Sequence, residues 1–229
     1  PPFHKVASMD VDNVPLLTRV AQTRRPVIVS CGMASNEEIG DVVDVMRANG
    51  NEQLVLLHCV SDYPAEERAL NLSMIPFLQG RYRTFVGLSD HTVGLTGASV
   101  ACALGAAVVE KHFTLDRSLA ASMPAADHEL SVEPEELRAM RRFSEAVPAV
   151  MGCAPLTLTE NEESGRLNCR RGMYAGRDIA AGETLDLENV TFLRPVRGLP
   201  AGAWNDIRGR RAASDIAADA PIAAARVEL

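Results

Sequence analysis

Two histidines, His91 and His112, are the residues of this 229-residue chain best suited to bind a divalent metal ion. Each follows a short apolar segment, and the two lie 21 positions apart. Neighbouring parallel strands lie about 5 Å apart, so imidazoles at their ends can share one ion. A lone histidine there is more often a hydrogen-bonded core residue, but Asp90 and Glu110 flank this pair and favour metal binding. Two histidines completed by water and substrate oxygens suit Mn²⁺ better than structural zinc.

A second group of polar residues also ends apolar segments, and it consists of Lys5, Ser8, Ser30 and Ser89. One ammonium and three hydroxyls, with Gly32 allowing close backbone approach, predict a cradle for a phosphorylated carboxylate. The alternative is that the serines only satisfy turns at strand ends. The chain has 23 Lys and Arg residues, and Lys5 and Lys111 are its two lysines. Each lysine either escaped a compositional bias toward arginine or occupies a position that needs a compact ammonium. For Lys111 the alternative is a surface position beside His112.

The elements that must position these residues are short apolar runs separated by helical patterns. The runs cover residues 5–8, 27–30, 54–59, 85–89 and 107–113. Helix signals occupy the intervals, such as Ser35 with Glu38 before an apolar stripe, Asn49-Gly50 at its end, and Glu133-Pro134 before a last helix. Continuous apolar strands spaced by helices predict an α/β fold with a parallel sheet buried on both faces.

The character of the chain changes after residue 150. Residues 1–150 carry the α/β pattern, residues 151–169 are polar and contain Gly152 and Pro155, and residues 170–229 have turn signals and little helical periodicity. We therefore expect a linker or linking helix over 151–169. We expect a small, mostly β domain over 170–229, near the size at which a separate core is marginal.

Composition narrows the function classes. The net charge of −7 argues against a nucleic-acid surface, and the longest apolar runs are too short to cross a membrane. The five cysteines are odd in number and form no C-x-x-C pair, which indicates a reducing, cytoplasmic compartment. No basic and apolar leader follows Pro1, so no targeting peptide is expected.

Several strings resemble the sialic acid synthase family. They are KVAS at 5–8, VSCGM at 29–33, LHCVSDYP at 57–64, VGLSDHT at 86–92, EKHFTLD at 110–116 and ADH at 126–128. The tail, from Arg170-Arg171 to the Phe192–Pro195 string, is similar to the C-terminal antifreeze-like (SAF) domain of that family. The resemblance covers essentially the whole chain, and it implies the last five βα units of a (β/α)₈ TIM barrel followed by an SAF domain.

The resemblance also implies a reaction. Such enzymes condense phosphoenolpyruvate with an open-chain N-acyl hexosamine, such as N-acetylmannosamine, to give a nonulosonic acid and phosphate. By the same resemblance, Mn²⁺ is held by His91 and His112, and phosphoenolpyruvate by Lys5, Ser8, Ser30 and Ser89. Asp127 is expected near the metal and the sugar, Tyr63 against substrate, and Arg194 at the N-acyl sugar of a partner's site in a domain-swapped homodimer.

Two departures from the family pattern qualify this expectation. The first three of eight barrel strands have no counterpart, and five parallel strands cannot close a barrel. We therefore expect a C-terminal portion of a longer enzyme, or a half whose other part is a separate chain. The loop at 118–127 is longer than the family's and lacks its PGP glycine, which loosens the placement of Asp127. The alternative is a truncated, non-catalytic fragment that binds a saccharide or a protein partner.

Overall fold

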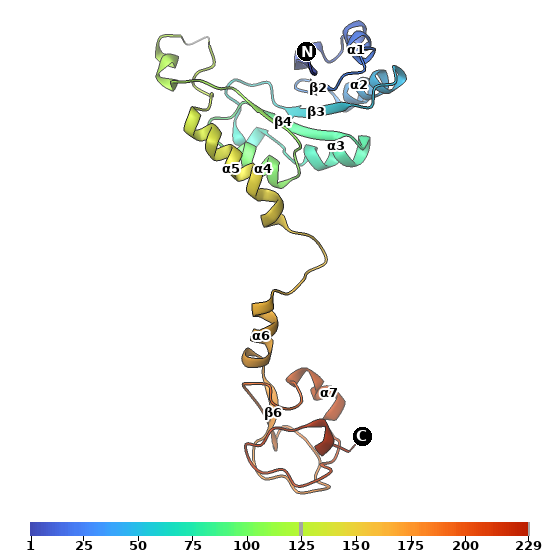
Figure 1. The fold of residues 1–229 in the computed structure, drawn as a ribbon, viewed down its shortest axis with the longest axis vertical. Helices are drawn as coiled ribbons and strands as arrows, with labels where there is room; N and C mark the ends of the chain where they lie inside the picture. Colours follow the sequence, from blue (N-terminus) through green and yellow to red (C-terminus); the bar gives the residue numbers. More distant parts are fainter. Residues whose placement is uncertain (124–125, 229) are drawn as a thin grey trace. The chain divides into compact units, whose positions relative to one another are not determined.

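The computed structural model describes residues 1–123 and 126–228 of the chain. They divide into two compact units, Pro1–Gly152 and Cys153–Leu229, whose ribbons are drawn in Figure 1. Within the described residues, no helix is long and apolar enough to cross a membrane.

The first unit is built on a five-stranded parallel sheet in the order β1-β2-β3-β4-β5. The strands are β1 (His4–Val6), β2 (Val27–Ser30), β3 (Leu54–Cys59), β4 (Phe85–Asp90) and β5 (Val109–Lys111). Sequence order equals spatial order, so every strand adds to the same edge as in a barrel. This confirms the predicted half-barrel of five parallel strands. The two edge strands are three residues long, which limits the unpaired backbone that an open sheet exposes.

Helices connect the strands and cover the sheet. They are α1 (Val14–Ala21), α2 (Asn36–Ala48), α3 (Met74–Tyr82), α4 (Thr96–Ala103) and α5 (Pro134–Met151). Single 3₁₀ turns follow β1 at Ser8–Asp10, precede α3 at Glu67–Ala69, and follow β5 at Arg117–Ala121.

Local sequence sets the helix ends. The Ser35 hydroxyl accepts from the Glu38 amide while the Glu38 carboxylate accepts from the Ser35 amide, a capping box that starts α2. Asn13 caps α1, whose first turn contains Pro15. The buried residues of these helices, such as Leu17 of α1 and Val42 of α2, belong to the core of the first unit.

The core of the first unit lies between the sheet and these helices. Val27, Val29, Leu56, Val86 and Leu88 are buried on the strands. They pack with buried residues of the covering helices, namely Leu17, Ile39, Val42, Met46, Ile75 and Leu78. The core residues alternate along each inner strand, as Val27 and Val29 do on β2, so the helices cover one face of the sheet. The other face is covered in part, since Leu57 is buried and Ile28 and Val55 are half-buried, so the expected burial on both faces holds only in part.

The second unit begins with α6 (Glu160–Cys169), which lies within the stretch expected to be a linker or linking helix. Its two-stranded antiparallel sheet pairs β6 (Gly172–Ala175) with β7 (Val190–Leu193), and α7 (Trp204–Ile207) follows. Isolated bridges, such as Ile179 with Ile216, extend this mostly β fold, and 3₁₀ turns lie at Ala201–Ala203 and Ala224–Arg226.

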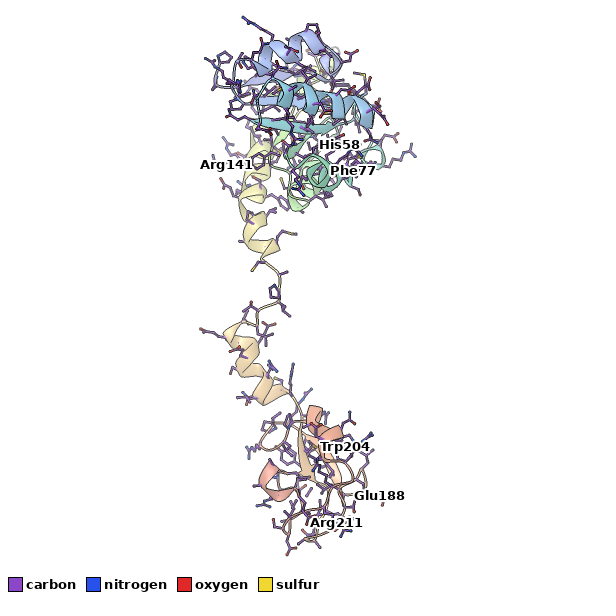
Figure 2. All side chains as sticks on the ribbon, turned by 90° about the vertical axis from the view of Figure 1, so that its right-hand side faces the viewer. His58, Phe77, Arg141, Glu188, Trp204 and Arg211 are labelled. Atoms are coloured by element: carbon purple, nitrogen blue, oxygen red, sulfur yellow. The ribbon has the colours of Figure 1, made fainter. Side chains whose placement is uncertain are left out.

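The second unit has its own apolar core. The core contains Met173, Ile179, Leu185, Ile216 and Ile222. Trp204, labelled in Figure 2, packs edge-on against Phe192 with 5.6 Å between ring centres. This arrangement agrees with the predicted small β domain.

Candidate functional site

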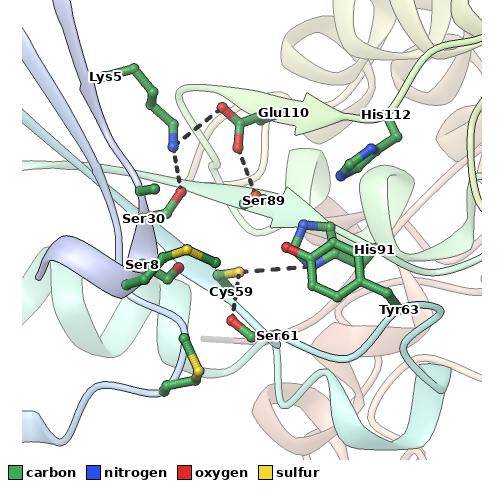
Figure 3. Close-up of a pocket in the computed structure, with 13 residues that line it drawn as sticks. Lys5, Ser8, Ser30, Cys59, Ser61, Tyr63, Ser89, His91, Glu110 and His112 are labelled. Carbon is green, nitrogen blue, oxygen red and sulfur yellow. Dashed lines mark hydrogen bonds and ion pairs between the residues drawn. The ribbon is translucent and has the colours of Figure 1, made fainter. Parts of the chain in front are cut away.

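A cavity of about 240 Å³ opens at the carboxyl ends of the five strands, shown in Figure 3. Its lining comprises Lys5, Ala7, Ser8, Met9, Ser30, Met33, Cys59, Ser61, Tyr63, Ser89, His91, Glu110 and His112. The carboxyl ends of parallel strands lie at the same edge of the sheet, so residues more than a hundred positions apart, such as Lys5 and His112, line one cavity. The cavity therefore brings both predicted groups of residues together.

The first part of the cavity contains the lysine and two of the serines. Lys5 Nζ donates to Ser30 Oγ at 2.8 Å and to the Val6 carbonyl at 3.2 Å. The Gly32 amide donates to Ser8 Oγ at 2.9 Å. A side chain at position 32 would crowd this region, since a Cβ there would lie 2.2 Å from Ser61 Oγ. The group presents one ammonium and several hydroxyls to a small space, as an anion site requires.

Glu110 lies in the same part of the cavity, and Figure 3 shows it between Lys5 and Ser89. Ser89 Oγ donates to Glu110 Oε1 at 2.7 Å, and Lys5 Nζ lies 3.5 Å from Glu110 Oε2. The sequence analysis treated Glu110 as support for a metal site. In the structure its carboxylate instead engages two residues of the predicted anion cradle.

The two predicted metal ligands lie side by side. The His91 and His112 rings have centres 5.4 Å apart and are inclined at 65°. His91 Nδ1 lies 2.8 Å from the Val60 carbonyl oxygen. A carbonyl only accepts, so Nδ1 carries the proton in the neutral ring and Nε2 keeps a free lone pair for a ligand.

The surroundings of the two imidazoles shift their pKa values in opposite directions. Burial lowers the pKa of His91, but hydrogen bonds to Cys59 and to the Val60 carbonyl outweigh it, and the pKa lies above its ordinary value. Burial and the nearby His91 lower the pKa of His112. His112 thus favours the neutral form, which is the form that binds metal ions.

Tyr63 and Asp127 border the histidine pair. The Tyr63 ring stacks on His91 with centres 4.1 Å apart and meets His112 edge-on at 5.8 Å. Tyr63 is 49% exposed, so part of its surface is open to a ligand. Asp127 has a φ of 55°, and its Oδ2 lies 3.9 Å from His112 Nδ1. Asp127 therefore lies beside His112, and residues 124–125 of its loop lie outside the described part.

Arg194 belongs to the second unit, as the sequence predicted, and is exposed. It lines a depression of about 570 Å³ with three other arginines, Arg166, Arg170 and Arg171. No ion pair to an acidic residue involves any of these four within the described residues.

His58 lies near the end of β3 but does not line the cavity, and its Nε2 lies 2.6 Å from the Leu70 carbonyl oxygen. Two expectations about polar residues need correction. Asp90 was expected to flank a metal site. Its buried carboxylate instead pairs with Lys111 and does not line the cavity. Lys111 is itself buried, and the alternative of a surface position is wrong.

Sequence reasoning did not single out Cys59 and Ser61, which also line the cavity. Cys59 Sγ lies 3.9 Å from both Ser61 Oγ and His91 Nδ1. Both residues are within the LHCVSDYP string, but cysteine at the end of an apolar strand also fits a core position. The contact with His91 spans 32 positions and needs the tertiary fold to be seen.

The donor set at His91 and His112 fits a metal ion bound by two protein ligands. Among the described residues, no cluster of three or more His, Cys, Asp or Glu is arranged to hold a metal. A closed structural site, which needs four protein ligands, is therefore not formed by this part of the chain. An open site completed by water and substrate oxygens agrees with two adjacent imidazoles.

The described residues thus form five βα units of a barrel, with Lys5 and the histidine pair at the strand ends, followed by a small β unit. The chain belongs to the NeuB family, whose family profile matches residues 1–155. The SAF domain profile matches residues 170–228.

Curated proteins with similar sequences support this family assignment. An uncharacterized Methanocaldococcus jannaschii protein is 39% identical over 93% of this chain and 62% of its own length. The N,N'-diacetyllegionaminic acid synthase of Campylobacter jejuni is 33% identical over 94% of this chain and 64% of its own length. The chain thus spans about three fifths of the curated relatives that it matches.

A solved structure agrees as well. The N-acetylneuraminic acid synthetase of Leptospira borgpetersenii is 36% identical, covers 71% of this chain and 55% of its own, and superposes with a TM-score of 0.65. Homologous proteins are therefore nonulosonic acid synthases.

Proposed function

We propose that this chain forms the catalytic half of a synthase that condenses phosphoenolpyruvate with an N-acyl hexosamine. The observation that carries the proposal is the meeting of the Lys5 cradle with the His91–His112 pair in one cavity at the strand ends. In the reaction, C3 of phosphoenolpyruvate bonds to the sugar aldehyde carbon, water adds at C2, and the C2–O bond to phosphate breaks. The products are a nonulosonic acid and inorganic phosphate.

Each residue of the cradle has a task in this proposal. The Lys5 ammonium and the hydroxyls of Ser8, Ser30 and Ser89 bind the phosphate and carboxylate oxygens of phosphoenolpyruvate. Lys5 is bonded to Ser30, Ser89 to Glu110, and Ser8 to the Gly32 amide, so these groups are already fixed around the cavity. Such preorganisation lowers the entropy cost of holding the two reactants in line.

His91 and His112 would hold Mn²⁺, and the bound ion would supply Lewis-acid polarisation of the sugar aldehyde. The Val60 carbonyl keeps the proton of His91 on Nδ1, which leaves Nε2 as the ligand atom. Tyr63 packs on His91 and limits water access on that side. Asp127, beside His112, is placed to accept a hydrogen bond from a sugar hydroxyl.

The second unit would complete the site of another subunit. In this proposal Arg194 donates to the N-acyl group of the hexosamine across a domain-swapped homodimer. The support is that Arg194 is exposed and has no carboxylate partner within the described part of the chain. A free guanidinium on a small unit with its own core is suited to such capping.

The test is phosphate release from phosphoenolpyruvate in the presence of Mn²⁺ and N-acetylmannosamine or another N-acyl hexosamine. We expect release that depends on the sugar and stops when a chelator removes the metal. Absence of release with every N-acyl hexosamine would contradict the proposal. The open five-stranded sheet of the described residues favours one second candidate, a non-catalytic chain that binds saccharide or a partner. Calorimetric titration with Mn²⁺ separates the two, because an intact histidine pair binds the ion and a collapsed site does not.

A further inference from the structure

Asp90 and Lys111 form an ion pair in the interior of the first unit. They are register partners on β4 and β5, and Lys111 Nζ lies 2.9 Å from Asp90 Oδ2. Their side chains are 0% and 1% exposed, whereas every other ion pair among the described residues has side chains at least 29% exposed. The pair therefore differs in kind from the surface pairs of this protein.

Both members of the pair also form hydrogen bonds with Thr92. Lys111 Nζ donates to the Thr92 carbonyl at 2.7 Å. Asp90 Oδ1 accepts from the Thr92 amide at 2.9 Å and from its hydroxyl at 2.8 Å. His91 lies between Asp90 and Thr92, so its backbone is fixed on both sides. His112 follows Lys111 directly, so the same ammonium ties its strand to the His91 segment.

Stability alone does not account for this arrangement. Burying two charges costs desolvation that their attraction only partly offsets, and apolar replacements of such pairs are often neutral or stabilising. What the pair provides is geometry, because one ammonium with two short bonds allows a single relative position of β5 and the Thr92 turn. This use also explains a lysine in a chain whose basic residues are otherwise arginine except Lys5, since a planar guanidinium does not match the compact contact.

We propose that Lys111 and Asp90 are positioning residues that hold the imidazoles of His91 and His112 at the separation needed to share one divalent cation. The inference rests on the proposed function of the histidine pair. It assigns Lys111 and Asp90 no contact with substrate or metal; they act through the two residues that follow them in the chain.

The experiment uses the double variant Asp90→Asn/Lys111→Met in the full chain. Asparagine keeps an Oδ1 acceptor for Thr92, and methionine fills the lysine space without leaving an unpaired charge. Thr92→Val is a milder variant that removes the hydroxyl bond to Asp90 and keeps the amide bond. Met46→Ala, at a fully buried residue of α2, is the control for loss of stability away from the site.

Two readouts are taken on each protein: Mn²⁺ affinity by electron paramagnetic resonance titration, and the side-chain nitrogen resonances of His91 and His112 without metal. We expect the double variant to bind Mn²⁺ about tenfold to a hundredfold more weakly, as second-layer changes around metal ligands do. We expect Thr92→Val to shift both measurements in the same direction and Met46→Ala to shift neither, although its melting temperature falls.

The outcomes separate this inference from the proposed function. If the wild type binds no Mn²⁺, the proposed function fails, and the resonances alone then decide whether the pair positions the rings. If the wild type binds and the folded double variant binds equally well with unchanged resonances, the positioning role is wrong. If the double variant does not fold, Thr92→Val decides by the same two measurements.

Discussion

Ser89 and Glu110 face each other on neighbouring strands, and the Ser89 hydroxyl donates to the Glu110 carboxylate at 2.7 Å. The second oxygen of Glu110 lies 3.5 Å from Lys5 Nζ. A negative side chain therefore occupies the space between two groups that we propose bind phosphoenolpyruvate. A trianionic ligand entering the cavity meets this charge at close range, and the repulsion has a measurable consequence.

Glu110→Gln should strengthen the binding of phosphoenolpyruvate. The amide keeps an oxygen acceptor for Ser89 and removes the charge that competes with the ligand for Lys5. We expect about threefold to tenfold tighter binding by isothermal titration, a free-energy gain of about 0.7–1.4 kcal/mol. The exposed variant Glu67→Gln makes the same change in net charge away from the cavity and should leave affinity unchanged. Weaker binding by Glu110→Gln would mean that the carboxylate orients the cradle rather than opposing the ligand.

Gly32→Ala should close the anion cradle without unfolding the sheet. The added Cβ would lie 2.2 Å from Ser61 Oγ, 2.9 Å from Ser8 Oγ and 3.0 Å from Cys59 Sγ, so these side chains must move into the cavity. We expect affinity for phosphoenolpyruvate to fall by at least about tenfold, which corresponds to about 1.4 kcal/mol.

The matched control for that variant is Gly80→Ala in α3, where a Cβ meets nothing within 4 Å. Alanine inside a helix is more stable than glycine by about 0.5–1 kcal/mol, so urea unfolding should show a small gain. Unchanged ligand binding by Gly32→Ala would show that the cradle is not where phosphoenolpyruvate binds.

The parallel sheet was predictable because its signal is local. The residues of β2 and β3 match the apolar runs at 27–30 and 54–59, since these strands carry apolar residues on both faces and have no polar alternation to blur their limits. The sequence analysis named no start or end signal for α3, because Pro76 and Gly80 interrupt a segment with little amphipathic pattern. Packing of Ile75 and Leu78 against the sheet stabilises it, and that contact is tertiary.

Residues of the site that lie at strand ends could be predicted from the sequence. Contacts that depend on the register between two strands could not. Two residues at the ends of parallel strands meet whatever lies between them, which is why His91 and His112 were found. The sequence does not show which way Lys111 points, because a three-residue edge strand has no periodicity to assign its faces. Only the register of Asp90 with Lys111 reveals the buried pair.

His58 should make stability depend on pH below neutrality. Burial lowers its pKa from the ordinary value of 6.5, and only its bond to the Leu70 carbonyl opposes this. The unfolded chain therefore takes up a proton first as the pH falls below 6.5. Stability from neutral His58 is complete above that value and is lost toward its lower folded pKa, with a slope of at most about 1.4 kcal/mol per pH unit.

Urea unfolding between pH 5 and 8 of the wild type and of His58→Gln measures this contribution. The stability difference between the two proteins should be constant above pH 6.5 and shrink at lower pH. A difference that does not change with pH would show that His58 keeps the same proton in both states.

Arg194→Ala should impair the use of the sugar far more than the use of phosphoenolpyruvate. In our proposal the guanidinium donates to the N-acyl group, and no residue of the Lys5 cradle depends on it. Steady-state kinetics should show KM for the N-acyl hexosamine raised by about tenfold or more, with KM for phosphoenolpyruvate within about twofold of the wild type. Arg208→Ala removes another exposed arginine of the same unit that does not line the Arg194 depression, and it should behave as wild type. Equal increases in both KM values for Arg194→Ala would rule out the role in sugar recognition, because an effect on folding or assembly reaches both substrates alike.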